Sequence, residues 1–126
     1  MNVETSLKAI LETVKIYFDG LYRSDSALLR GIFHPSATII GYGGDGELKT
    51  MTLNDFLGFV DTVPSPQAAG TDFDMSVLSL DQSGKAAALK VHDYYLGRDF
   101  IDYLHLAETD SGWKITAKAF HSDRRA

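Results

Sequence analysis

The sequence predicts a single α+β domain in which three N-terminal helices pack on a strongly curved, mostly antiparallel sheet. Three observations carry this prediction: helical apolar spacing in the first half, alternation of apolar and polar residues from residue 73 onward, and short polar turns between the later segments. A chain of 126 residues has the length of one domain. We therefore expect residues 1–126 to form one folding unit.

Helical spacing and capping residues predict the helices. The first helix carries an apolar stripe of Leu7, Ile10, Leu11, Val14, Tyr17, Phe18 and Leu21. Ser24 or Asp25 can cap a second helix, which Pro35 stops. Thr52 begins a third helix, and Asp55 three residues later completes a pattern that resembles a capping box.

The strands are predicted from alternation and from turn residues. A short strand over residues 37–42 is followed by the turn "GGDG" and by "ELKTM". Four longer strands then begin near residue 73, separated by "DQSG", "LGRD" and "TDSG". Consecutive strands with short turns form an antiparallel meander, which accounts for the sheet.

Composition excludes several classes of function. The net charge is -5, and the longest basic run is in the final "DRRA", so we expect no nucleic-acid partner. The absence of cysteine excludes thiolate catalysis and Cys-type zinc sites. The histidines have no metal-ligand spacing, and the chain has no P-loop or GxSxG, so we expect neither a metal nor a cofactor. Without a signal peptide or a membrane span, we expect a cytoplasmic protein with no membrane partner.

Asp102 is the residue that the pattern does not explain, because it stands on an apolar strand face between Phe100 and Leu104. A buried carboxyl group is costly unless it is neutralised or paired, for example with Arg98 or Lys118. Side chains that face the same interior would form a ligand pocket. The candidate ligand-binding residues are Tyr17, Phe100, Asp102, Leu104, Trp113 and His121.

With "FHPSA" after the second helix and "GWKITAKAFH" near its end, the chain resembles the nuclear transport factor 2-like superfamily. Within it, the chain is similar to the putative lumazine-binding group, with ketosteroid isomerase-like and polyketide-cyclase-like (SnoaL-like) proteins as relatives. This resemblance implies that Tyr17 and a neutral Asp102 both donate hydrogen bonds to a ligand oxygen. It also places Gly41 where the isomerases have their general base, which argues against steroid isomerisation.

We therefore expect a small-molecule-binding protein whose mostly apolar pocket holds a neutral aromatic or carbonyl-bearing ligand. One alternative is a cofactor-independent isomerase or lyase that uses Tyr17 and Asp102, with Asp93 or His121 as the base. Another is a dimeric scaffold domain. A homodimer is expected through the outer sheet face, where we place the aromatic and histidine side chains of Tyr94, Tyr103, His105 and Phe120.

Overall fold

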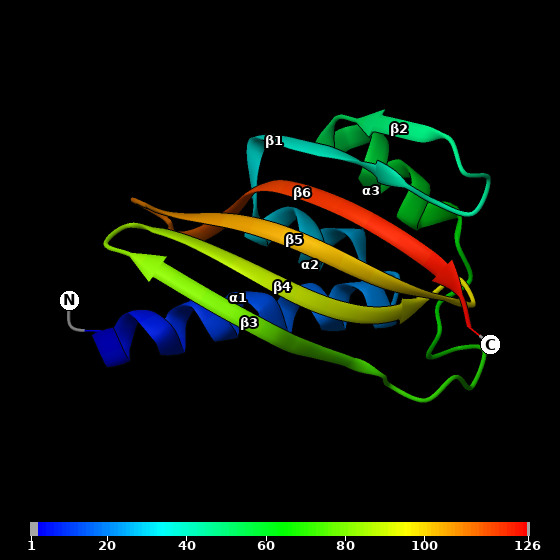
Figure 1. The fold of residues 1–126 in the computed structure, drawn as a ribbon, viewed down its shortest axis with the longest axis horizontal. Coiled ribbons are helices and arrows are strands. Elements are labelled where there is room, and N and C mark those ends of the chain that lie inside the picture. The colour runs from blue at the N-terminus through cyan, green and yellow to red at the C-terminus, as the bar shows by residue number, and fades with distance from the viewer. Residues whose placement is uncertain (1–2, 126) are drawn as a thin grey trace.

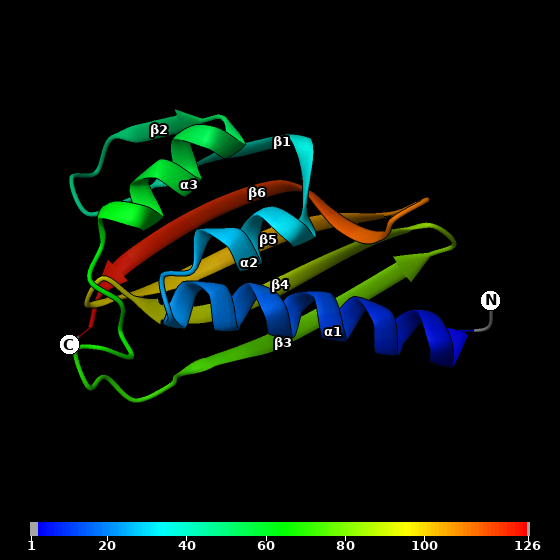
Figure 2. The same cartoon turned by 180° about the vertical axis from the view of Figure 1, so that it is seen from behind.

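Three helices cover one face of a mixed sheet in the computed structural model, which describes residues 3–125 (Figures 1 and 2). The elements are α1 (Val3–Tyr22), α2 (Ser26–Ile32), β1 (Phe33–Tyr42), β2 (Leu48–Met51), α3 (Leu53–Thr62), β3 (Met75–Ser83), β4 (Ala86–Tyr95), β5 (Arg98–Thr109) and β6 (Gly112–Arg124). The strand order is β2-β1-β6-β5-β4-β3. Among the strands of residues 3–125, only β1 and β6 pair in parallel, so the predicted α+β class with a mostly antiparallel sheet is confirmed.

The predicted caps begin the two shorter helices. The side chain of Asp25 accepts a hydrogen bond from the backbone N–H of Leu28 at the start of α2. Thr52 and Asp55 form a reciprocal capping box at the start of α3. In the part of the chain that the structure describes, no helix has both the length and the apolar character needed to span a membrane.

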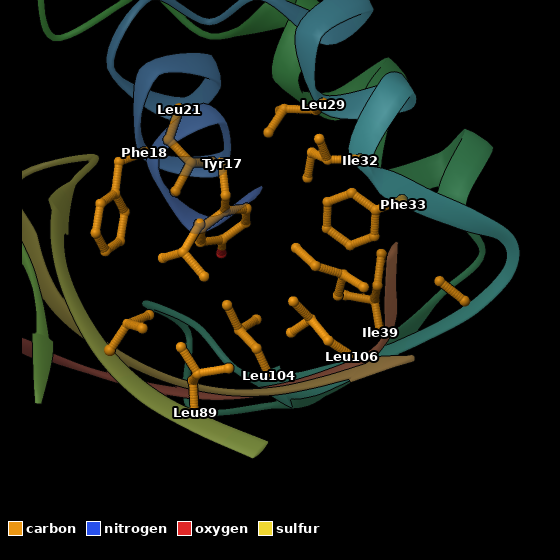
Figure 3. Packing of buried hydrophobic residues seen from close by; sticks show 14 of the residues in the cluster. Tyr17, Phe18, Leu21, Leu29, Ile32, Phe33, Ile39, Leu89, Leu104 and Leu106 are labelled. Carbon is orange, nitrogen blue, oxygen red and sulfur yellow. The ribbon is translucent and has the colours of Figure 1, made fainter. Parts of the chain in front are cut away.

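The core fills the space between the helices and the concave face of the sheet. Figure 3 shows Tyr17 and Leu21 of α1 facing Leu89 and Leu104, which rise from the sheet opposite. Leu11 was predicted to lie on the buried stripe of α1, but it is 45% exposed. The stripe is therefore narrower than the sequence suggested, and the helix turns Leu11 toward solvent.

A β-bulge in β6 decides which side chains face the interior. His105 of β5 pairs with Ala117 and the adjacent Leu106 pairs with Ile115, so Thr116 has no partner in the register. The hydroxyl of Thr116 donates instead to the carbonyl oxygen of His105, at 3.2 Å. Because an extra residue moves each following side chain to the opposite face, Trp113 and Ile115 point inward before the bulge and even-numbered residues do so after it.

Candidate functional site

A pocket of about 410 Å³ lies between α3 and the concave face of the sheet. Its walls are mainly aromatic and aliphatic, and they include Leu21, Phe56, Phe59, Tyr95, Phe100 and Phe120. The side chains of Asp93 and Lys118 line the pocket and are buried, whereas Lys49, at the pocket edge, is exposed and forms an ion pair with Asp45. The volume and lining are those of a small-molecule site with a few fixed polar groups.

Tyr17 and Asp102 are hydrogen-bonded to each other behind this pocket. The Tyr17 hydroxyl donates to Asp102 Oδ2 at 2.6 Å, and both side chains are fully buried. Burial, followed by the nearby carboxyl groups of Asp102 and Asp93, raises the pKa of Tyr17 well above its ordinary value, so the hydroxyl keeps its proton. Neither side chain lines the pocket. The expected pair of donors aimed at a ligand is therefore wrong, because Asp102 accepts the hydrogen bond that Tyr17 donates.

Asp93 connects the Tyr17–Asp102 pair to the pocket. It lies opposite Phe100 in the register, so Asp102 is its diagonal neighbour on the same face of the sheet. Asp93 is only 2% exposed, and burial followed by the charge of Asp102 raises the pKa of Asp93 well above its ordinary range. Lys118 opposes this shift but does not cancel it.

The two carboxyl groups are arranged to share one proton. Asp93 Oδ2 and Asp102 Oδ1 are both buried, and neither has a hydrogen-bond partner among residues 3–125 when both groups are treated as acceptors. A proton held by Asp93 and donated to Asp102 satisfies both atoms at once. The order from the helix to the pocket is then Tyr17, Asp102 and Asp93, with Asp93 as the member that a ligand can reach.

Lys118 brings a cation into the same site. Its Nζ lies 4.4 Å from the ring centroid of Phe56, 5.3 Å from that of Tyr17 and 5.4 Å from that of Phe120. Within the described residues it forms no ion pair or hydrogen bond. The rings stabilise an ammonium group electrostatically and leave its N–H donors unused. Lys118 is therefore available to a ligand oxygen.

Tyr95 supplies a third unsatisfied polar group. Its hydroxyl is buried in the wall of the pocket and has no hydrogen-bond partner in residues 3–125 by distance and angle. Burial and then Asp93 raise the pKa of Tyr95, and a contribution from Ser24 opposes them. The neutral hydroxyl can donate to a ligand or accept from one.

The other predicted site residues lie in three different places. Phe100 lines the pocket, as expected. Leu104 and Trp113 are buried in the core but do not line the pocket. His121 was predicted to point inward, and this is wrong: its side chain is 61% exposed and contacts Asp123 at 3.1 Å on the outer face. The bulge at Thr116 is the reason, because it exchanges the two faces of the strand beyond it.

Because of the same bulge, the prediction of which side chains lie on the outer face is wrong for one residue. Phe120 does not contribute to it, because its ring lines the pocket. Tyr103 and His105 are exposed there, as expected, and Tyr103 is 51% exposed. Tyr94 is partly covered by the guanidinium of Arg125, which lies 3.8 Å from the centre of its ring. The alternative in which Asp102 pairs with Arg98 is not found in the described residues, since the Arg98 Nε donates to Ser122 Oγ at 2.9 Å.

Gly41 lies where no side chain fits. A Cβ atom at this position would overlap the main-chain oxygen and the ring of Phe120, its neighbour in the parallel pairing. The position that the resemblance assigns to an isomerase base is thus closed by the packing of Phe120. The carboxyl group of Asp45 also lines the pocket, but it is exposed and ion-paired with Lys49, so Asp93 of β4 is the buried carboxyl group available as a base.

Sequence reasoning did not assign Lys118, Tyr95 and Phe120 to the pocket. The signal for Lys118 and Phe120 was present: the apolar positions of the last strand are odd-numbered at Trp113 and Ile115 and even-numbered at Phe120. Such a change of phase is typical of a bulge. In residues 3–125, no group of three or more histidine or carboxylate side chains is placed to hold a metal ion.

Comparisons with known proteins identify the fold and the family. The family model described as "Putative lumazine-binding" matches residues 5–121. NTF2-like proteins of unknown function from Silicibacter pomeroyi DSS-3 and Shewanella baltica OS155 are each 25% identical, with TM-scores of 0.86; the alignments cover 98% and 99% of this chain and 100% and 99% of theirs. A ketosteroid isomerase-like protein from Erwinia carotovora atroseptica is 13% identical over 99% of this chain and 100% of its own, with a TM-score of 0.72. No curated protein matches the chain.

Proposed function

Because this chain belongs to the putative lumazine-binding family of nuclear transport factor 2-like proteins, we propose that it binds a small, neutral, carbonyl-bearing aromatic molecule. One observation carries the proposal: the pocket has aromatic walls, and its polar groups Asp93, Tyr95 and Lys118 have unused hydrogen-bonding capacity. Buried polar groups without partners are costly, so a ligand that pairs with them gains affinity as well as orientation.

The charges in the pocket favour a neutral ligand. One proton shared by Asp93 and Asp102 leaves that pair with a single negative charge, which the ammonium of Lys118 offsets, while the guanidinium of Arg98 at the pocket wall donates to Ser122. An ionised ligand would disturb this balance in a site of low dielectric constant. A ring carbonyl can accept from Lys118, while a neighbouring N–H or O–H can pair with Asp93 or Tyr95. Lumazine, a bicyclic pteridine with ring carbonyl and N–H groups, has this pattern and is the ligand in the family description.

A thermal-shift series tests the proposal. We expect stabilisation by at least one member of a panel of lumazine, lumichrome, 2-naphthol and a steroid ketone, but not by sugar phosphates. A free ligand at ten times its dissociation constant adds about 1.4 kcal/mol to the free energy of unfolding. Stabilisation by sugar phosphates alone would contradict the proposal.

Two variants locate the binding. Phe100→Leu removes a ring from the pocket wall and should cost about 0.5–1.5 kcal/mol of binding to an aromatic ligand. His121→Ala changes an exposed residue of the outer face and is the matched control, for which we expect unchanged affinity. Equal losses in the two variants would place the ligand outside this pocket.

Cofactor-independent proton transfer is a second candidate, and the position of Asp93 favours it. Moving the proton of Asp93 to the adjacent Asp102 leaves a carboxylate at the pocket wall that can accept a proton from carbon, and Lys118 faces the same space. The test is hydrogen–deuterium exchange next to the carbonyl of 2-tetralone in D₂O, followed by NMR. We expect exchange above the buffer rate in the wild type and its loss in Asp93→Asn; equal rates would exclude Asp93 as the base.

A further inference from the structure

Lys118 differs from the other lysines in its surroundings. Its side chain is only 6% exposed and lies against the pocket, enclosed by the rings of Tyr17, Phe56 and Phe120. Lys90 also lies over a ring, that of Tyr103 at 5.9 Å, but on the outer face of the sheet. An amine in an apolar, water-poor pocket is in the environment that favours nucleophilic lysines.

The carboxyl pair beside Lys118 can take up its proton. Asp93 lies beside Asp102 in the interior, and the ammonium of Lys118 lies close enough to influence Asp93. Transfer of the ammonium proton to the carboxyl pair replaces two opposite buried charges by a neutral amine and a neutral acid. Lower dielectric surroundings favour that exchange.

We propose that Lys118 forms an imine with an aldehyde or ketone ligand in this pocket, an inference that rests on the carbonyl-bearing ligand proposed above. The amine nitrogen attacks the carbonyl carbon, and the electrons of the C=O π bond move to the oxygen, which takes a proton from Asp93. The resulting carbinolamine loses its hydroxyl group as water, again with a proton from the carboxyl pair, and a C=N bond forms. The nitrogen releases both its protons to the pair, so the net change is amine plus carbonyl giving imine plus water.

Reductive trapping tests this chemistry. The protein is incubated with 2-naphthaldehyde and sodium cyanoborohydride at neutral pH, and the product is analysed by intact mass and peptide mapping. We expect one naphthylmethyl group on Lys118, formed about tenfold or more faster than on any other lysine, because binding holds the aldehyde next to this amine. The wild-type peptide map alone gives this result, so it does not depend on a variant that folds.

Three variants sharpen the result. Lys118→Met keeps an unbranched apolar side chain among the rings and should lose the selective adduct, whereas Lys90→Met should label as the wild type does. Asp93→Asn should slow labelling about tenfold at saturating aldehyde, where weaker binding does not limit the rate. Unchanged labelling in Asp93→Asn would overturn its role in the proton transfers.

Binding of 2-naphthalenemethanol, which cannot form an imine, distinguishes a failure of imine formation from a failure of the proposed binding function. If 2-naphthalenemethanol binds but the aldehyde labels surface lysines and Lys118 at equal rates, imine formation is refuted and the binding function stands. If neither compound nor any member of the ligand panel binds, both proposals fail. Selective labelling that persists in Lys118→Met would also overturn the assignment to this residue.

Discussion

Replacing Asp93 with asparagine should change how the stability of the protein depends on pH. The pKa of Asp93 is raised in the folded state, so the folded protein keeps a proton that the unfolded chain releases above about pH 4. Unfolding is then favoured as pH rises, until the pH passes the folded-state pKa of Asp93. Asparagine cannot titrate, and its amide can still donate to Asp102 Oδ1.

The size of the effect follows from one proton. While the folded state holds one more proton than the unfolded chain, the free energy of unfolding falls by about 1.4 kcal/mol per pH unit. Starting near pH 4, the free energy of unfolding of Asp93→Asn should therefore rise relative to that of the wild type, by up to about 1.4 kcal/mol per pH unit. Arg125 and then His92 lower the pKa of Asp99, so the stability that this residue contributes is lost as the pH falls. Because Asp99 is present in both proteins, its contribution cancels when the two are compared.

Urea unfolding at a series of pH values, from about pH 4 to pH 8, measures this difference. Asp110→Asn, at an exposed turn, is the control and should follow the wild-type curve at a constant offset. Parallel curves for Asp93→Asn and the wild type would refute the shared proton. A difference that shrinks as pH rises would refute the direction of the shift.

Three further predictions concern the interior and the outer face. Tyr17→Phe leaves Asp102 Oδ2 without its donor and should cost about 1.5–3 kcal/mol in urea unfolding; a loss below measurement error would show that the bond is not needed. Gly41→Asp forces a side chain against Phe120, so we expect a melting temperature well below that of Gly31→Asp, where the space is open; equal melting would contradict the packing argument. We expect a homodimer through the outer sheet face with about 1,600 Å² buried, which Tyr103→Glu should dissociate in sedimentation experiments; a wild-type monomer at tens of micromolar would exclude it.

Local patterns were enough to predict most of the fold. The caps at Asp25 and Thr52 and the turns of the meander depend on residues close in sequence, so they can be recognised without a structure. The inward position of Asp102 also followed from strict alternation along β5, where no bulge precedes it. Its contact with Tyr17 was anticipated only through the resemblance to the isomerases, because 85 residues separate the two.

The sequence by itself determined the elements, their order and the burial of a carboxyl group among apolar neighbours. The tertiary structure decided the chemistry of the pocket, because a single unpaired residue in β6 turned Lys118 and Phe120 inward and His121 outward. It also decided that Tyr17 donates to Asp102 and that Asp93 faces the pocket. Alternation fixes side-chain direction only relative to neighbours on one strand, whereas hydrogen-bond partners and shared protons depend on the distances between strands and helices that folding creates.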